Sequence, residues 1–205
     1  MNNTVIPVIT IDGPSGAGKG TVAQMLALDL GWNILDSGAL YRTLAYYFDK
    51  EGLEPGDLVS NCEKIREDFI VHFVAGIPGQ PVKIFFQNQD ITNLVRTEEV
   101  AKKTSLLAAN PYVRAFIKPS QRDFMTSPGL IADGRDMGTV IFPDADLKIY
   151  LTASIEERAK RRQVQLKRQG SEVNMRVLLE ELKDRDKNDT EREHSPLKPA
   201  DDSII

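Results

Sequence analysis

The chain contains a single cysteine, Cys62, among its 205 residues. One cysteine cannot form an intramolecular disulfide, and such sparse use is typical of proteins from a reducing compartment. A long apolar run is also missing, because the first one, Val5–Ile11, is too short for a signal peptide or a membrane span. We therefore expect a cytoplasmic protein with no membrane partner.

An excess of positive charge is absent as well. The formal net charge is -4, with 27% charged and 41% hydrophobic residues. This balance gives no bulk attraction to nucleic acid or to an anionic membrane, and it is typical of a globular chain. We expect one domain and no nucleic-acid partner, with any anionic ligand held by local clusters of basic residues.

What the sequence does contain is a glycine-rich stretch between a β-branched apolar run and a segment with helical spacing. The apolar positions of that helix are Val22, Met25, Leu26 and Leu30, and Gly31 is its end signal. A strand, a glycine-rich loop and a helix in this order are typical of a phosphate-binding loop. The loop reads Gly13, Pro14, Ser15, Gly16, Ala17, Gly18, Lys19, Gly20 and Thr21.

Each part of this loop has a chemical use. The glycines let backbone N–H groups point inward, and these groups hold phosphate together with the helix N-terminus. Lys19 supplies a positive charge for the transferring phosphate, and Thr21 supplies a hydroxyl for Mg²⁺. The common pattern places Ser or Thr directly after the lysine. Here Gly20 intervenes, an offset found in nucleoside monophosphate kinases.

A second motif, which ends in an acidic residue, supports the interpretation of the glycine-rich stretch as a phosphate-binding loop. Leu130–Asp133 is a predicted buried strand that ends in a carboxylate, and Gly134–Thr139 follows as a predicted loop. In nucleoside triphosphatases, an acid in this position orients Mg²⁺ or its water. The motif is weak alone, but it becomes informative in a chain that also carries a phosphate-binding loop.

Between these motifs the chain alternates strand and helix. Trp32–Asp36 predicts a strand, and Asp36 or Ser37 caps a helix that carries Arg42. Ligands of open α/β sheets bind at the carboxyl ends of strands, near which Arg42 lies. A solvated surface arginine explains Arg42 equally well.

An antiparallel block interrupts this alternation. Pro55–Asp68 predicts a helix with Cys62 packed inward, whereas Phe69–Val74 and Val82–Phe86 predict a hairpin, with Ile91 as a candidate start of a third strand. We interpret the block as an inserted lobe. Its lone histidine, His72, fits a packed or half-exposed position better than a ligand.

Helices are expected to follow. Val95–Ala109 predicts one helix capped by Thr97, and Asn110 caps the next, in which Pro119 predicts a break at Lys118–Ser120. After the predicted strand Leu147–Leu151, residues 154–157 have the form of a capping box.

The helix that these capping residues begin is unusually basic. It is either a solvated face or a lid that brings arginines to the transferring phosphoryl group. Gly170 is expected to end it. In the helix after that, Arg185, Asp189 and Arg192 share one face, as a salt-bridge ladder or as a nucleotide-recognition face.

Four motifs together resemble the bacterial cytidylate kinase family: Gly13–Thr21, Asp36–Arg42, Gly129–Thr139 and Arg185–Arg192. The resemblance runs from about Thr4 to the end. It implies transfer of the γ-phosphoryl group of ATP to CMP or dCMP, with Mg²⁺, in pyrimidine metabolism. It also implies an α/β fold of the P-loop NTPase type, a single kinase domain whose five-stranded parallel sheet is flanked by helices.

The resemblance further implies a monophosphate-binding lobe at about residues 37–110 with its β insert near 69–92, a lid at about 154–172, and a monomer. It assigns roles residue by residue. Arg42 and Arg135 hold the CMP phosphate, Ser105, Arg114, Asp136 and Arg192 read cytosine, and Arg185 and Asp189 hold the sugar hydroxyls. Ser37 and Asp133 complete the substrate set. The expected catalytic residues are Lys19, Arg135, Arg158 and Arg162, and the expected metal ligands are Thr21 and Asp133.

Two features depart from the family pattern. Pro119 falls where relatives continue a helix, and Asp202–Ile205 predicts a final strand where relatives add a C-terminal helix. Two other functions remain open. One is a related kinase for UMP, AMP or a non-nucleotide acceptor. The other is a nucleotide switch, which would need a guanine-reading Asn-Lys-x-Asp element, and Lys187-Asn188-Asp189 has the wrong order.

Overall fold

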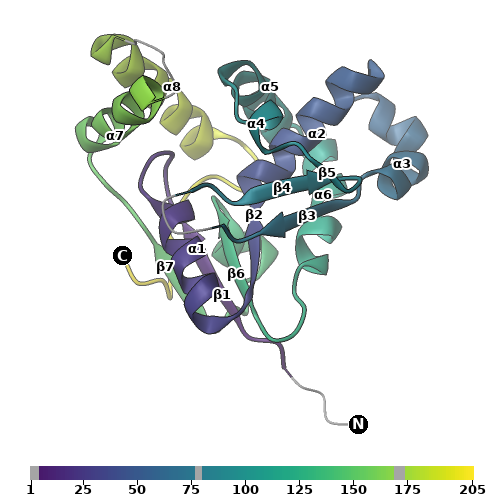
Figure 1. The fold of residues 1–205 in the computed structure, drawn as a ribbon, viewed down its shortest axis with the longest axis horizontal. Helices are drawn as coiled ribbons and strands as arrows, with labels where there is room; N and C mark the ends of the chain where they lie inside the picture. The colour runs from purple at the N-terminus through teal and green to yellow at the C-terminus, as the bar shows by residue number, and fades with distance from the viewer. Residues whose placement is uncertain (1–4, 77–79, 169–173) are drawn as a thin grey trace.

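The structure is a computed structural model that describes residues 5–76, 80–168 and 174–205. Its centre is a parallel sheet in the order β2-β6-β1-β7, with β1 at Val8–Asp12, β2 at Asn33–Asp36, β6 at Leu130–Gly134 and β7 at Leu147–Tyr150. Apolar runs of this kind are buried on both faces when helices cover a parallel sheet. Figure 1 shows the helices around this sheet.

The predicted count of five parallel strands was wrong, because the described sheet has four. The predicted final strand is reduced to one parallel bridge between Ile204 and Ile149. The Ile204 N–H donates to the Lys148 carbonyl at 2.9 Å, and the Tyr150 N–H donates to the Ile204 carbonyl at 2.7 Å. A turn at Ala200–Ser203 brings only Ile204 alongside β7.

Helix α1 (Lys19–Leu30) ends at Gly31 as predicted, but its predicted buried face was largely wrong. Leu26 packs partly against the sheet, whereas Val22, Met25 and Leu30 are exposed, and the buried residues are Lys19, Ala23, Gln24 and Ala27. Small alanines let the helix approach the sheet closely, where they pack with Ile11, Ile34, Val82 and Ile131. Helix α2 (Ser37–Glu51) begins as predicted, because the Asp36 carboxylate accepts from the Ala39 N–H at 2.8 Å.

The antiparallel insert is confirmed as a three-stranded sheet of β3 (Val71–Val74), β4 (Lys83–Phe86) and β5 (Gln89–Asp90), so that the third strand lies before Ile91. Helix α3 (Asp57–Asp68) precedes it, and Cys62 packs against the main core. His72 is exposed. Residues 77–79, in the predicted turn, lie outside the described residues.

The predicted helix Val95–Ala109 is two helices, α4 (Thr92–Val95) and α5 (Glu98–Ala109), because Thr97 begins α5 as its N-cap and so interrupts the run. Helix α6 (Pro111–Asp123) starts at its predicted Asn110 cap. The predicted break was wrong, since α6 continues through Pro119. Burial of Val113, Phe116, Ile117 and Gln121 holds both halves of α6 in place and outweighs the local cost of proline.

The remaining elements surround the loop end of the sheet. A π-helical turn, η1 (Met137–Ile141), takes up part of the predicted loop after β6. Helices α7 (Ile155–Arg168) and α8 (Met175–Glu191) pack side by side beyond the N-terminal end of α1 (Figure 1). The Ser154 hydroxyl accepts from the Glu157 N–H at 3.2 Å, as its capping role predicts. The expected helix end at Gly170 lies outside the described residues.

None of the described helices is long and apolar enough to cross a membrane.

Candidate functional site

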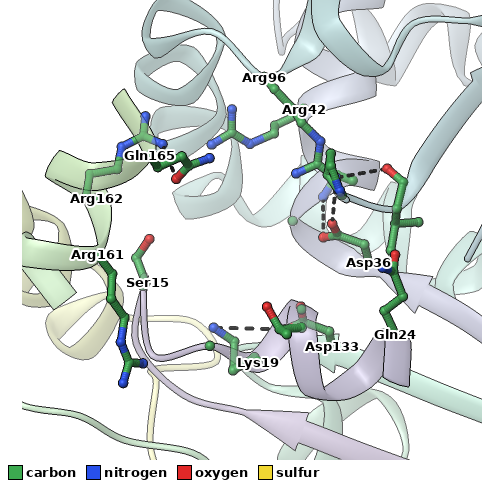
Figure 2. A pocket seen from close by; sticks show the side chains of 18 of the residues that line it. Ser15, Lys19, Gln24, Asp36, Arg42, Arg96, Asp133, Arg161, Arg162 and Gln165 are labelled. Atoms are coloured by element: carbon green, nitrogen blue, oxygen red, sulfur yellow. Dashed lines mark hydrogen bonds and ion pairs between the residues drawn. The ribbon is translucent and has the colours of Figure 1, made fainter. Parts of the chain in front are cut away.

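A cavity of about 960 Å³ opens where the glycine-rich loop meets α2, the insert and α7–α8. Seven basic side chains line its described part, against three carboxylates, although the whole chain is acidic. Figure 2 shows several of them pointing inward from opposite walls. The basic residues are Lys19, Arg42, Arg96, Arg135, Arg161, Arg162 and Arg185, and the acids are Asp36, Glu98 and Asp133. This local excess favours a ligand with several negative charges.

The loop adopts the conformation that its glycines allow. Gly16 and Gly18 have positive φ values of 80° and 104°, and a Cβ on Gly13 would lie 2.0 Å from the Leu151 carbonyl oxygen. Other residues would strain these positions. The cavity is lined by Ser15, Gly16, Gly18, Lys19, Gly20 and Thr21, but not by Gly13, Pro14 or Ala17.

Lys19 and Asp133 face each other across the cavity floor. The Lys19 Nζ donates to the Pro14 carbonyl at 3.0 Å and lies 3.9 Å from an Asp133 carboxylate oxygen (Figure 2). Burial lowers the pKa of Lys19 to about 8, with Arg135 adding to the effect and Asp133 opposing it. Burial also raises the pKa of Asp133 to about 7, with Lys19 opposing. The predicted loop lysine and strand-end acid are therefore brought together.

Asp12 ties the two motifs to each other, and the sequence interpretation missed it. Its carboxylate oxygens accept from the Met137 and Gly138 N–H groups, both at 2.8 Å. The residue is 5% exposed, and burial raises its pKa to about 6. The sequence did carry a signal for Asp12, because it ends an apolar strand in the same way that Asp133 ends Leu130–Asp133. Asp12 fixes the segment after Asp136 relative to the glycine-rich loop.

Arg42 and Arg96 form the wall opposite α7. The Arg42 Nη1 donates to the Val95 carbonyl at 3.0 Å, and burial, reinforced by Arg185, lowers the pKa of Arg42 to about 10. Arg96, which the sequence interpretation also missed, donates to the Val82 carbonyl at 3.2 Å and lies 3.5 Å from the Asp36 carboxylate. Arg96 reaches the cavity because it lies in the break between α4 and α5. The sequence predicted one continuous helix there, so its spacing did not indicate Arg96 as a site residue.

The basic helix divides into two parts. Arg161 and Arg162 line the cavity, and Arg162 pairs with Glu98 of α5 across it. Arg158 does not line it. Instead its guanidinium contacts both oxygens of Asp186 in α8 and donates to the Ser15 carbonyl at 3.0 Å. The structure thus places Arg158 behind the loop, as a link between the loop and two helices.

None of the residues expected to read cytosine lines the cavity, and three of them, Arg114, Asp136 and Arg192, form a cluster beside it. Arg114 donates to Asp136, and the Arg192 Nη2 lies 3.9 Å from the other Asp136 oxygen. Ser105 is half-buried on α5. Ser37 is buried and accepts from the Gln121 amide at 2.8 Å.

Of the two residues expected at the sugar, Asp189 pairs with Arg135. The Arg135 Nε donates to an Asp189 carboxylate oxygen at 2.8 Å, and Arg135 and Arg185 both line the cavity. Burial opposes ionisation of Asp189, but Arg135, together with Arg185 and Arg192, more than compensates and lowers the pKa of that carboxyl. The Arg135–Asp189 contact joins α8 to the segment at the end of β6, whereas Arg192 lies just beyond the end of α8, in extended backbone, and so is not on the helix.

Comparisons with known proteins identify the family of this chain. A model of the cytidylate kinase family matches residues 9–205. A cytidylate kinase of Stutzerimonas stutzeri A1501 is 52% identical over 97% of this chain and 86% of its own length. One from Pseudomonas putida KT2440 is 51% identical over 98% and 88%. Among solved structures, TT1252 from Thermus thermophilus covers 94% of this chain and 86% of its own at 18% identity and a TM-score of 0.44. The family model and the two cytidylate kinases show that the chain belongs to the cytidylate kinase family.

Proposed function

We propose that this protein transfers the γ-phosphoryl group of ATP to CMP or dCMP and releases ADP with CDP or dCDP. The observation that carries the proposal is the cavity itself, in which a glycine-rich loop, its lysine, a strand-end carboxylate and six arginines converge. Phosphoryl transfer needs positioning and charge neutralisation more than covalent help, so it requires no protein nucleophile. Family membership supports the same reaction.

The donor phosphates occupy the glycine-rich loop in this proposal. Backbone N–H groups at the start of α1 bind them, and Lys19 compensates charge on the transferred group. Arg161 and Arg162 approach from the facing helix α7, in the segment that we propose as a lid. Arg158 supports the loop through Ser15.

The site also fits a magnesium ion. Magnesium in such sites binds nucleotide phosphates and water together with one or two protein oxygens. Thr21 and Asp133 line the same cavity beside Lys19 and would hold the ion. Bound there, Mg²⁺ would neutralise phosphate charge.

The acceptor phosphate lies between Arg42 and Arg135 in this proposal, both of which line the cavity together with Lys19. The sugar lies against Arg185 and Asp189 of α8, so that Arg135 exchanges its contact with Asp189 for the substrate. The proposed monophosphate-binding lobe, residues 37–110 with the insert at 69–92, forms this half of the site. Ser37 at the start of α2 lies next to it.

Base recognition rests on the cluster around Asp136. A carboxylate accepts from the amino group of cytosine, and arginines such as Arg114 and Arg192 donate to N3 and O2. Uracil presents a carbonyl where cytosine has its amino group, which leaves buried polar groups mispaired. That mispairing costs several kcal/mol, or roughly 10⁴-fold in kcat/KM at best.

An ADP-release assay with CMP, dCMP, UMP and AMP tests the proposal. We expect high kcat/KM with CMP or dCMP and little turnover with UMP or AMP. Preference for UMP, AMP or a non-nucleotide acceptor would assign the same fold to another small-molecule kinase. Phosphate release with no acceptor would indicate a hydrolysing switch protein instead.

A further inference from the structure

Gln24 of α1 lies where the glycine-rich loop region meets the antiparallel insert. It is 3% exposed, although it is a polar residue one turn beyond Thr21. Its Nε2 donates to the Gln80 carbonyl at 2.7 Å, and its Oε1 accepts from the Gly76 N–H at 3.2 Å. One side-chain amide therefore holds the two described ends of the β3–β4 connection.

Apolar packing reinforces this junction. Val82, directly before β4, is buried in one cluster with Ala23 and Ala27 of α1 and with the sheet residue Ile11. Gln24, Gln80, Pro81 and Val82 also line the cavity. The insert is thus docked on the helix that carries the donor-site residues, and it forms part of the cavity wall.

From Val82 the contacts continue to the acceptor side. The Val82 carbonyl accepts from Arg96, and Arg96 lies 3.5 Å from the Asp36 carboxylate (Figure 2). Asp36 in turn caps α2, which carries Arg42. Polar contacts, joined by the backbone from Gln80 to Val82, therefore connect α1 through the insert to the start of the helix that holds the proposed acceptor-phosphate arginine.

We propose that Gln24 is a positioning residue that couples the donor helix to the acceptor site through the insert and Arg96. This inference rests on the proposed function. With Gln24 in place, the insert holds the Val82 carbonyl where it orients Arg96, so the acceptor wall is formed before the substrate binds. Without it, binding the monophosphate must also order that wall, which weakens acceptor affinity but leaves the bound geometry unchanged.

The test is a steady-state comparison of the wild type with Gln24→Leu, which keeps the volume and removes the amide. We expect the KM for CMP to rise about tenfold, as is typical when buried hydrogen bonds must be re-formed on binding. The kcat and the KM for ATP should stay within about twofold. Leu28→Ala, an exposed position on the next turn of α1, is the control and should change none of the three.

Two further variants keep the test decisive. Gln24→Glu retains an acceptor for the Gly76 N–H but repels the Gln80 carbonyl, and we expect a KM for CMP between those of wild type and Gln24→Leu. Arg96→Met should raise the KM for CMP, and adding Gln24→Leu should raise it little further, because residues in one series of contacts are not additive. Fold-changes that multiply in the double variant would overturn the coupling.

The outcomes separate this inference from the proposed function. Failure of the wild type to phosphorylate any of the four acceptors would overturn both. If the wild type is active and Gln24→Leu changes only the melting temperature, or raises the KM for ATP instead, Gln24 serves stability or the donor loop and the inference is wrong. Should Gln24→Leu fail to fold, an unchanged KM for CMP in Gln24→Glu would contradict it in the same way.

Discussion

Asp12 is a buried carboxylate whose ionisation works against folding. Burial raises its pKa from 3.8 to about 6, although the Met137 and Gly138 N–H groups oppose the shift. Between these two pH values the folded state binds more protons than the unfolded state, so stability falls as pH rises through this window. The loss amounts to about 3 kcal/mol by pH 7.

Asp12→Asn removes that pH dependence. We expect the free energy of unfolding of the variant, relative to wild type, to rise by roughly 2 kcal/mol between pH 4 and pH 7, since only wild type carries the desolvated charge. Urea unfolding of both proteins at each pH measures the difference, in which the other titrating groups cancel. A constant difference across this range would show that Asp12 is ionised as readily in the folded chain as in the unfolded one.

Asp136 carries a proposed recognition role and a structural role at once. Arg114 donates to it and Arg192 lies nearby, in a site where both partners are buried. Asp136→Asn weakens the pair and should lower the free energy of unfolding by roughly 3 kcal/mol. Because an amide can donate to the uracil carbonyl, kcat/KM should fall strongly with CMP and much less with UMP. An unchanged CMP/UMP ratio in the folded variant would leave Asp136 a structural role only.

At the scale of elements, the contacts of Arg158 join α7, α8 and the glycine-rich loop. Its side chain is 5% exposed and contacts both oxygens of Asp186. The ammonium group of Arg158→Lys cannot make the bidentate contact with Asp186 and also reach the Ser15 carbonyl. We expect a loss of about 3 kcal/mol in the free energy of unfolding and a higher KM for ATP, with a smaller effect on CMP.

The matched control is Arg176→Lys. Arg176 also pairs with an acid of α8, Glu180 at 3.3 Å, but its side chain is 87% exposed. Such pairs contribute about 0.5 kcal/mol or less. If the two variants are destabilised equally in thermal and urea unfolding, burial of the Arg158 pair contributes nothing to the free energy of unfolding.

The sequence predicted elements well where local chemistry sets their limits. Asn110 and Asp36 cap the helices they were expected to cap, and Gly31 ends α1, because side-chain caps and left-handed glycines act within a few residues. The prediction was wrong where distant contacts decide. Burial keeps α6 helical at Pro119, and close packing on the sheet buries alanines of α1 instead of its larger side chains.

At the scale of the molecule, the site joins segments far apart in the chain. Lys19 and Asp133 could be predicted to meet, because parallel strands bring their carboxyl ends to one edge of the sheet. Gln24 and Arg96 could not be predicted, because their positions depend on how the insert docks against α1 and α2. No local pattern encodes that docking.

The most direct test of the central claim follows the γ-phosphoryl group itself. ATP labelled with ³²P in the γ position is incubated with CMP and the wild-type protein, and the nucleotides are separated. The account predicts label in CDP, and a loss of about 10²-fold or more in the rate with Lys19→Met, which keeps the side-chain length without the charge. Label found only in inorganic phosphate, or reaching CDP equally fast in the variant, would contradict phosphoryl transfer in this cavity.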